Sequence, residues 1–198
     1  MNNKTALITG ATSGIGEATA RCFARKGIRL VLCGRNTQKL EQLKASLPTE
    51  VHTLAFDVAN KTAVSDAISA LPDDFASVDI LINNAGNAHG LAPIHEGDIE
   101  DWDQMIDINV KGLLYVSKAI LPQMVERKSG HIIHIGSTAG KEVYPNGNVY
   151  CASKHAVDAL NKAMRIDLNP YNIRVGAIHP GMVETNFSNV RFKGDQER

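Results

Sequence analysis

The sequence lacks the features that suit a protein to nucleic acid or to a membrane. Its 21 acidic and 21 basic side chains give a formal net charge of zero, and Lys and Arg are spread along the chain rather than gathered into a basic stripe. No apolar run is long enough to span a bilayer, and the N-terminal residues lead into a strand-like run without the hydrophobic region of a signal peptide. We therefore expect a cytoplasmic protein that binds neither nucleic acid nor membranes.

Cysteine is also scarce. The three cysteines, Cys22, Cys33 and Cys151, are odd in number and widely spaced, which suits neither a disulfide framework nor a zinc site. The histidines, including His131 and His134 in one expected strand, show no ligand spacing either. The sequence thus predicts no metal, and it predicts cysteines that serve as small buried side chains in a reducing compartment.

What the sequence does contain is an alternation of short β-branched runs and amphipathic stretches. We expect strands at 6–9, 29–33, 51–56, 79–83, 131–135 and 173–178, and helices at 13–26, 37–47, 60–70, 101–127 and 149–168. This alternation predicts a doubly wound α/β fold of the Rossmann type, with helices on both faces of a parallel sheet. We expect one domain over residues 1–198, whose ligands bind beyond the carboxyl ends of the strands, near the point where strand order reverses.

The first expected strand runs into G-A-T-S-G-I-G, which carries Gly10, Gly14 and Gly16. Glycine lets the backbone bend and approach a pyrophosphate closely, and the N-terminus of the following helix offers free N–H groups and a partial positive charge. An ordinary tight turn is the alternative for such a triplet out of context. The strand before it and the amphipathic helix after it favour a dinucleotide-binding turn.

The second expected strand ends in C-G-R-N, which bears on the choice between NAD and NADP. An acidic side chain in the place of Gly34 would bind the ribose 2′-hydroxyl of NAD. Glycine followed by Arg35 instead leaves room for the 2′-phosphate of NADP and supplies a bidentate partner for it, and Ser13 would converge on the same phosphate. Arg35 as a solvated loop residue is the alternative, but the pattern favours NADP.

The third and fourth expected strands also end in residues that suit a ligand. The third runs into Asp57 and Val58, where Asp57 has two compatible roles, as a partner of the adenine amino group or as the cap of the following helix. The fourth runs into N-N-A-G at residues 83–86. This segment reads as a tight turn pressed against a ligand or a neighbouring strand, and Gly86 would allow the close approach.

Several motifs follow one another along the chain: T-G-A-T-S-G-I-G, N-N-A-G, I-N-V, I-G-S-T-A-G, Y-C-A-S-K and H-P-G-M-V-E-T. In order and spacing they resemble the short-chain dehydrogenase/reductase family from the first residue to the last. The resemblance implies an oxidoreductase that moves a hydride between NADP(H) and a CH–OH group, with Asn109, Ser137, Tyr150 and Lys154 as catalytic residues. The cofactor-binding residues that it implies are Gly10, Thr12, Ser13, Gly14, Ile15, Gly16, Arg35, Asp57, Val58, Asn84, Ala85, Gly86, Tyr150, Lys154, Pro180, Gly181, Val183 and Thr185.

The spacing of Tyr150 and Lys154 has its own physical meaning. Residues at i and i+4 share a helix face, so the ammonium can lie near the phenol and near a bound nicotinamide ribose. The pKa of a free tyrosine is about 10, and a neighbouring cation lowers it towards the range in which a general base works. We therefore expect Tyr150 to remove the alcohol proton as hydride leaves the same carbon, and to protonate the carbonyl oxygen in the reverse reaction. An isolated Y-x-x-x-K would usually be an exposed pair, and the partner motifs overturn that alternative.

The remaining site residues take their roles from the family. Ser137 follows the fifth expected strand and would hydrogen-bond the substrate oxygen, although a serine there alone is usually a turn residue or an N-cap. Asn109 lies in mid-helix, where asparagine is unfavourable; the family implies that it holds a water joining Lys154 to solvent, and a local kink is the alternative. The family also implies that Pro180-Gly181 borders the nicotinamide and that Thr185 bonds its carboxamide or the diphosphate.

The segment at 186–194 lies where the family has a variable substrate lid. Together with 100–113 and 131–141 it resembles the bacterial branch of NADP-dependent 3-hydroxy acid dehydrogenases, which implies substrates such as serine, L-allo-threonine and 3-hydroxypropionate, or malonic semialdehyde in the reverse direction. Arg191 or Lys193 would pair with the substrate carboxylate, and exposed loop residues are the alternative. We therefore predict that Ser137, Tyr150 and Arg191 bind the substrate.

Family members continue past this lid with further helices and a seventh strand. We therefore expect the natural protein to extend beyond Arg198, residues 186–198 to be the start of the lid, and the full-length protein to form a homotetramer. Two other functions remain open. One is a 3-oxoacyl-carrier-protein reductase or broad carbonyl reductase, which would share every cofactor motif. The other is an NADP-binding regulatory protein without catalysis, against which the complete catalytic set argues.

Overall fold

The computed structural model describes residues 4–185, 187 and 191. Its centre is a parallel sheet of six strands in the order β3-β2-β1-β4-β5-β6. The strands are β1 (Thr5–Thr9), β2 (Arg29–Gly34), β3 (Val51–Ala55), β4 (Ile80–Asn83), β5 (Gly130–Ile135) and β6 (Ile173–Ile178). Strand order reverses between β1 and β4, which is the topological switch point of a doubly wound sheet. The predicted fold class is confirmed.

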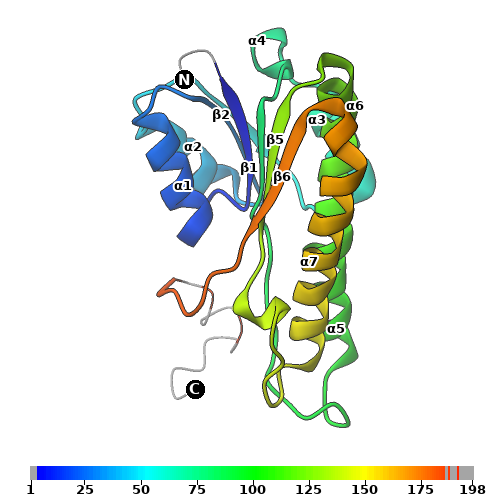
Figure 1. Ribbon diagram of the computed structural model, residues 1–198. Coiled ribbons are helices and arrows are strands. Elements are labelled where there is room, and N and C mark those ends of the chain that lie inside the picture. Colours follow the sequence, from blue (N-terminus) through cyan, green and yellow to red (C-terminus); the bar gives the residue numbers. More distant parts are fainter. Residues whose placement is uncertain (1–3, 186, 188–190, 192–198) are drawn as a thin grey trace.

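Helices cover both faces of the sheet (Figure 1). On one face lie α1 (Gly14–Ala24) and α2 (Thr37–Ala45), and on the other α3 (Lys61–Ser69), α6 (Leu113–Arg127) and α7 (Asn148–Leu168). The shorter elements are α4 (Asp73–Ala76), α5 (Ile99–Ile106), a π-helix η1 (Asp107–Gly112) and two 3₁₀ turns, η2 (Thr138–Gly140) and η3 (Asn169–Tyr171). Within the described residues, no helix combines the length and the apolar character that crossing a bilayer requires.

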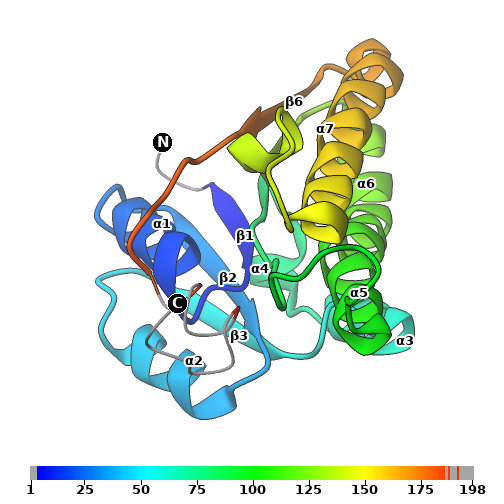
Figure 2. The same cartoon turned by 90° about the horizontal axis from the view of Figure 1, so that it is seen from below.

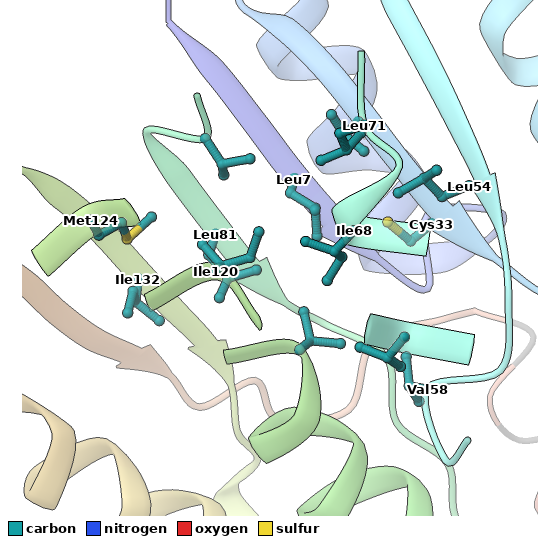
Figure 3. Close-up of a cluster of buried hydrophobic side chains, with 14 of the residues drawn as sticks. Leu7, Cys33, Leu54, Val58, Ile68, Leu71, Leu81, Ile120, Met124 and Ile132 are labelled. Carbon is teal, nitrogen blue, oxygen red and sulfur yellow. The ribbon is translucent and has the colours of Figure 1, made fainter. Parts of the chain in front are cut away.

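The strands are buried on both sides, so successive side chains enter two separate cores. Leu7 of β1 and Leu81 of β4 pack with Ile120 and Met124 of α6, as Figure 3 shows. Ile8, the next residue of β1, lies in the opposite core, against α1 and α2. These residues are 0% exposed. Full burial of such a side chain contributes roughly 1.5–3 kcal/mol, which fixes the strand ends that carry the site.

One predicted helix is not continuous in the structure. The single helix predicted over 101–127 consists of α5, the π-helix η1 and α6 in succession. The wider turn of η1 contains Asn109, and a Cβ on its last residue, Gly112, would lie 2.8 Å from Val58 Cγ2. A π-turn accommodates an extra residue without breaking the helix, and such turns are frequent at functional sites. The helix is therefore locally irregular at Asn109 as a π-turn, and a kink there stays a prediction.

Candidate active site

The carboxyl ends of the strands, seen end-on in Figure 2, carry the glycine turn after β1. Gly10 and Gly14 have φ values of +62° and +53°, in the left-handed region that favours glycine. A Cβ on Gly16 would lie 2.3 Å from the Gly10 carbonyl oxygen and 2.5 Å from Asn84 Nδ2. Ser13 is the N-cap of α1, and within the described residues its side chain makes no capping hydrogen bond. The first N–H groups of α1 thus remain available for an anion, as a pyrophosphate requires.

The turn after β4 is fastened to this glycine turn. Asn84 Nδ2 donates hydrogen bonds to the carbonyl oxygens of Thr9 and Gly10, at 2.9 and 3.1 Å. The backbone N–H groups of Asn84 and Ala85 donate to Thr9 Oγ1. The Asn84 side chain therefore holds the neighbouring strand, which was one of the two uses that the sequence allowed. Contact of Asn84 with a cofactor stays a prediction.

Of the residues proposed to choose between NAD and NADP, Ser13 lines a pocket of about 440 Å³, whereas Gly34 and Arg35 are not among its lining residues. Thr12, Ser13 and Gly14 line this pocket, together with Lys39 of α2. Arg35 lies 3.6 Å from Asp57 in an ion pair whose two side chains are 71% and 40% exposed. An ion pair this exposed contributes at most about 1 kcal/mol to stability, so the guanidinium of Arg35 can leave Asp57 and bind another anion.

Asp57 and Gly34 have visible structural roles in the same region. Asp57 Oδ1 accepts a hydrogen bond from the Ala59 N–H at 2.9 Å, within the turn that precedes α3. The N-cap of α3 is Asn60, whose side chain accepts from the Ala63 N–H, so the capping role considered for Asp57 is wrong. A Cβ on Gly34 would lie 3.1 Å from Thr12 Cγ2. Glycine at this position therefore lets Thr12 pack closely, in addition to any room that it leaves for a phosphate.

Tyr150 and Lys154 lie together at the start of α7, and both are buried. Lys154 Nζ is 6.0 Å from the centroid of the Tyr150 ring and donates a hydrogen bond of 3.0 Å to the carbonyl oxygen of Ile135, at the end of β5. Burial lowers the pKa of Lys154 to about 8, because the ammonium loses hydration. The end of β5 thus holds the amine at the place that the i, i+4 spacing predicts.

The net shift of the Tyr150 pKa is opposite to the expected one. Burial raises the pKa of Tyr150 above its ordinary value, and the hydrogen bond with Ser137 and the charge of Arg191 only partly oppose that shift. The expectation that the Lys154 cation would dominate is therefore wrong, because desolvation of the phenolate outweighs the groups that favour it. The protonated phenol is the favoured form, which suits Tyr150 to donate a proton.

Ser137 is both the N-cap that its position suggested and a partner of the phenol. Its Oγ accepts a hydrogen bond from the Ala139 N–H at 3.1 Å, at the start of η2. A serine hydroxyl that accepts from a backbone N–H can still donate its own hydrogen. That hydrogen can serve the hydrogen bond with Tyr150, which lowers the pKa of the phenol.

Asn109 has a buried role that its position in a helix did not reveal. Its Oδ1 accepts a hydrogen bond from the Asn87 N–H at 2.8 Å, and its Nδ2 donates to the Asn87 carbonyl oxygen at 2.8 Å and to Ser153 Oγ at 3.0 Å. It therefore joins the segment after β4 to α7. A Cβ on Gly86 would lie 3.1 Å from Asn109 Oδ1 and 3.3 Å from Lys154 Nζ, so glycine at 86 admits both side chains. The relay of protons through a water stays a prediction.

A second buried polar cluster escaped the sequence reasoning. Asn83 Nδ2 donates to Ser117 Oγ at 2.9 Å and lies 3.2 Å from His134 Nδ1. Burial lowers the pKa of His134 to about 4, so its ring is neutral near pH 7. The available signal was the pair His131 and His134 in a strand whose other residues are apolar or glycine. Among the residues that the structure describes, no group of three or more His, Cys, Asp or Glu side chains is placed to hold a metal ion.

The substrate side of the site contains Arg191. Its guanidinium carbon lies 5.5 Å from the ring centroids of both Tyr144 and Tyr150, and its Nε donates to the Gly90 carbonyl oxygen at 3.3 Å. A pocket of about 200 Å³ is bounded by the segment after β4, by α5, by the start of α7 and by Arg191. Phe187 packs on the Tyr150 ring at 5.7 Å. The other residues of the expected lid, including Lys193, lie outside the described residues.

The last group of predicted cofactor residues follows β6. The carbonyl oxygen of Pro180 accepts a hydrogen bond from the Thr138 N–H at 3.0 Å, beside Ser137. A Cβ on Gly14 would lie 3.2 Å from Thr185 Cβ, so Thr185 lies against the glycine turn. Gly181 and Val183 are exposed between these points. Ile15 lies in the first turn of α1 and Val58 packs beside Gly112, so the predicted residues surround one end of the sheet.

Comparison with known proteins adds three findings. A family model described as short chain dehydrogenase matches residues 4–196. The NADP-dependent 3-hydroxy acid dehydrogenase YdfG of Salmonella typhi is 48% identical over 193 residues, which are 97% of this chain and 78% of that protein. Serine 3-dehydrogenase of Rhizobium radiobacter is 44% identical over 98% of this chain and 77% of its own length.

Two solved structures are also similar. The closed form of serine dehydrogenase complexed with NADP+ has a TM-score of 0.93 and 46% identity, over 98% of this chain and 78% of that chain. The 3-ketoacyl-(acyl-carrier-protein) reductase of Brucella melitensis complexed with NADH has a TM-score of 0.91 and 31% identity, over 96% and 80% of the two chains.

Proposed function

The chain belongs to the short-chain dehydrogenase family, and from that premise we propose that it is an NADP-dependent dehydrogenase of small 3-hydroxy acids. The observation that carries the proposal is the meeting of Tyr150, Ser137 and Lys154 at the strand ends, next to a glycine turn that fits a pyrophosphate. The relatives named for 3-hydroxy acids and for serine support the substrate class. The similar structure that holds NADP+ supports the cofactor.

The cofactor would lie across the switch point. The glycine turn and the first turn of α1 would hold its pyrophosphate, and Arg35 with Ser13 would hold the 2′-phosphate. When bound there, the cofactor would supply hydride-transfer chemistry: the hydride of the hydroxyl-bearing carbon would pass to NADP+ in oxidation and return from NADPH in reduction. The remaining chemistry, which is proton transfer and orientation, belongs to the side chains of the site.

Tyr150 would carry the proton. In the reduction direction its phenol would donate a proton to the carbonyl oxygen, and the raised pKa keeps the phenol protonated before that step. In the oxidation direction the phenolate has to be stabilised, and Ser137, Arg191 and the nearby ammonium of Lys154 are the groups placed to do so. The Ser137 hydroxyl would hydrogen-bond the substrate oxygen and hold the reacting carbon in line.

We assign recognition of the substrate carboxylate to Arg191. Its guanidinium stands beside the Tyr150 ring and lines the same pocket, so a carboxylate bound there would place a nearby hydroxyl group against the phenol. Arg191→Ala should raise the KM for L-serine and for 3-hydroxypropionate by about 10- to 100-fold, because a charged hydrogen-bond partner is lost. Arg165→Ala, an exposed arginine of α7, is the matched control. An unchanged KM in the Arg191 variant would refute this assignment.

The substrate class itself is tested by NADP+ reduction with L-serine, L-allo-threonine and 3-hydroxypropionate. The likeness to a 3-ketoacyl-carrier-protein reductase keeps that activity as the second candidate, and reduction of an acetoacetyl thioester with NADPH tests it. Turnover of the thioester but of none of the hydroxy acids would reverse the order of the two. If none of these substrates is turned over although the protein binds NADPH, the non-catalytic regulatory protein would be favoured.

A cytoplasmic location and a homotetrameric full-length protein are further proposals, which rest on the family resemblance. Fractionation of cells that express the full-length protein tests the first. Sedimentation equilibrium tests the second.

A further inference from the structure

His179, which directly follows β6, lies against the backbone of Ser137. Its Nδ1 is 3.1 Å from the Ser137 carbonyl oxygen, and its Nε2 is 3.4 Å from Asp158 Oδ1 on α7. A carbonyl oxygen only accepts hydrogen bonds, so Nδ1 must carry a ring hydrogen. The imidazole therefore bridges the backbone of one site residue to the helix that carries two others, Tyr150 and Lys154.

The fold makes room for this ring. A Cβ on Gly136 would lie 2.6 Å from His179 Nδ1 and 2.8 Å from Cε1, so only glycine at 136 admits the imidazole. Pairing between the two segments also continues past the strand ends: the Gly136 N–H donates to the Ile178 carbonyl oxygen at 2.7 Å, and the Thr138 N–H donates to the Pro180 carbonyl oxygen at 3.0 Å. These two bonds bracket Ser137 on either side.

Asp158 holds the far end of the bridge. Its side chain is 10% exposed and contacts Lys141 at 2.7 Å and Lys162 at 2.8 Å, in addition to His179. These lysines hold the pKa of Asp158 at about 2, so the carboxylate is ionised under ordinary conditions. Asp158 lies four residues after Lys154, one turn further along the same helix. An ionised carboxylate only accepts hydrogen bonds, so Asp158 orients the ring in the form that carries a hydrogen on both nitrogens.

Ser137 depends on its backbone for its direction. Its φ and ψ are −168° and 158°, and its carbonyl oxygen accepts from the Gly140 N–H at 2.9 Å as well as from His179. Because the hydroxyl is also tied to the Ala139 N–H, a rotation of this peptide would carry the hydroxyl away from Tyr150. A misplacement of about 1 Å in a catalytic group can reduce the rate about 100-fold.

We propose that His179 is a positioning residue that, oriented by Asp158, fixes the Ser137 peptide so that the Ser137 hydroxyl stays directed at Tyr150 and the substrate oxygen. This inference rests on the proposed dehydrogenase function for its kinetic consequences. Its structural content, which is the order of the 136–140 segment, does not depend on that function. Conservative substitutions can separate the two contacts of the ring.

The test compares His179→Asn with His179→Gln. An Asn amide nitrogen comes near the place of Nδ1 and keeps a donor for the Ser137 carbonyl oxygen, whereas a Gln amide nitrogen reaches the place of Nε2 and keeps only the Asp158 contact. We expect His179→Gln to lower kcat about 10- to 100-fold with the KM for NADP+ unchanged, and His179→Asn to stay within about threefold of the wild type. Equal losses in the two variants, or a greater loss in His179→Asn, would overturn the proposal.

A double-mutant cycle with Ser137→Ala asks whether His179 acts through Ser137. In the Ser137→Ala background, His179→Gln should cause no further fall in kcat. A full additional loss would show that His179 acts by another route. Thermal melting of each variant establishes that it folds.

Hydrogen–deuterium exchange gives a readout that is independent of turnover. The amides of residues 136–140 should exchange faster in His179→Gln than in wild type, and His179→Asn should retain the wild-type rate. Unchanged exchange in His179→Gln would refute the positioning role. An inactive wild type with the expected exchange pattern would instead count against the proposed function alone.

Discussion

The two halves of the sheet build their parts of the site in opposite ways. On the side of β1, β2 and β3 the essential feature is space: Gly10 and Gly16 leave out side chains, and the backbone comes close to where a pyrophosphate would lie. On the side of β4, β5 and β6 the essential feature is a set of buried polar groups, such as Asn109 and Lys154. The first half should therefore be sensitive to added atoms. The second should be sensitive to the loss of particular polar atoms.

The largest effect is expected from removing one oxygen atom in the second half. Tyr150→Phe keeps the ring that packs on Phe187 but loses the proton carrier, so kcat should fall by about 10²- to 10⁴-fold. Binding of NADPH, followed by its fluorescence, should persist because the glycine turn is intact. Tyr171→Phe, at an exposed tyrosine, serves as the control. Near-normal turnover in Tyr150→Phe would remove Tyr150 from the catalytic assignment.

Lys154 should make the stability of the second half depend on pH. Its folded pKa of about 8 lies below its ordinary value of 10.5, so the unfolded chain binds the proton more tightly and burial of the cation destabilises the fold most below about pH 8. That cost is relieved as pH rises towards the unfolded value. Relative to Lys154→Met, the wild type should gain roughly 2–3 kcal/mol of unfolding free energy between about pH 7 and about pH 10.

Denaturant titrations without added cofactor measure this difference. Lys118→Met, at an exposed lysine of α6, is the control and should show no such dependence on pH. A constant difference between wild type and Lys154→Met would mean that the buried amine keeps its ordinary pKa.

The corresponding test of the first half adds one carbon atom. Gly16→Ala would place a Cβ 2.3 Å from the Gly10 carbonyl oxygen, so the turn must shift, which should lower stability by about 1–3 kcal/mol and weaken NADPH binding. In Gly176→Ala the new Cβ would meet no described atom within 4 Å, which makes it a matched control in β6. If the two variants melted and bound NADPH alike, close approach would not explain the glycine turn.

The smallest expected effect concerns the choice of cofactor. Arg35→Ser should weaken NADPH binding about tenfold and leave NADH binding nearly unchanged, because the lost partner serves only the 2′-phosphate. Direct titration of both cofactors measures the ratio, and Arg25→Ser, at another exposed arginine, is the control. Equal weakening of both cofactors would assign Arg35 a structural role through its contact with Asp57.

The sequence predicted the parts that depend on local pattern. The strand boundaries lie within one residue of those expected, and the glycine turn and the Tyr150–Lys154 pair are where their motifs indicated. Such features follow from periodicity and spacing along a short stretch of chain. The family resemblance then joined motifs that no local argument connects.

The features that escaped prediction depend on tertiary surroundings. The π-helix at Asn109 adds one residue to a turn, and the apolar residues on either side keep a helical spacing that conceals it. The direction of the Tyr150 pKa shift depends on burial, which raises the pKa against the groups that lower it, and the sequence motif does not reveal how deeply the phenol is buried. The contact of His179 with Ser137 joins residues 42 positions apart. It also requires glycine at 136, because a Cβ there would clash with the His179 ring, and only the three-dimensional structure shows that clash.

The switch point between β1 and β4 also has a consequence for how the chain folds. Ala6 pairs with Ile80, a longer span of sequence than any other strand pairing in the described sheet bridges. Closing that span has the largest loop entropy, and pairings of high contact order form slowly. A ligand that binds across the ends of β1 and β4 only when the two strands are paired would stabilise that pairing by mass action. We therefore expect bound NADP to stabilise the pairing of β1 with β4 and to slow its opening, in addition to taking part in the reaction.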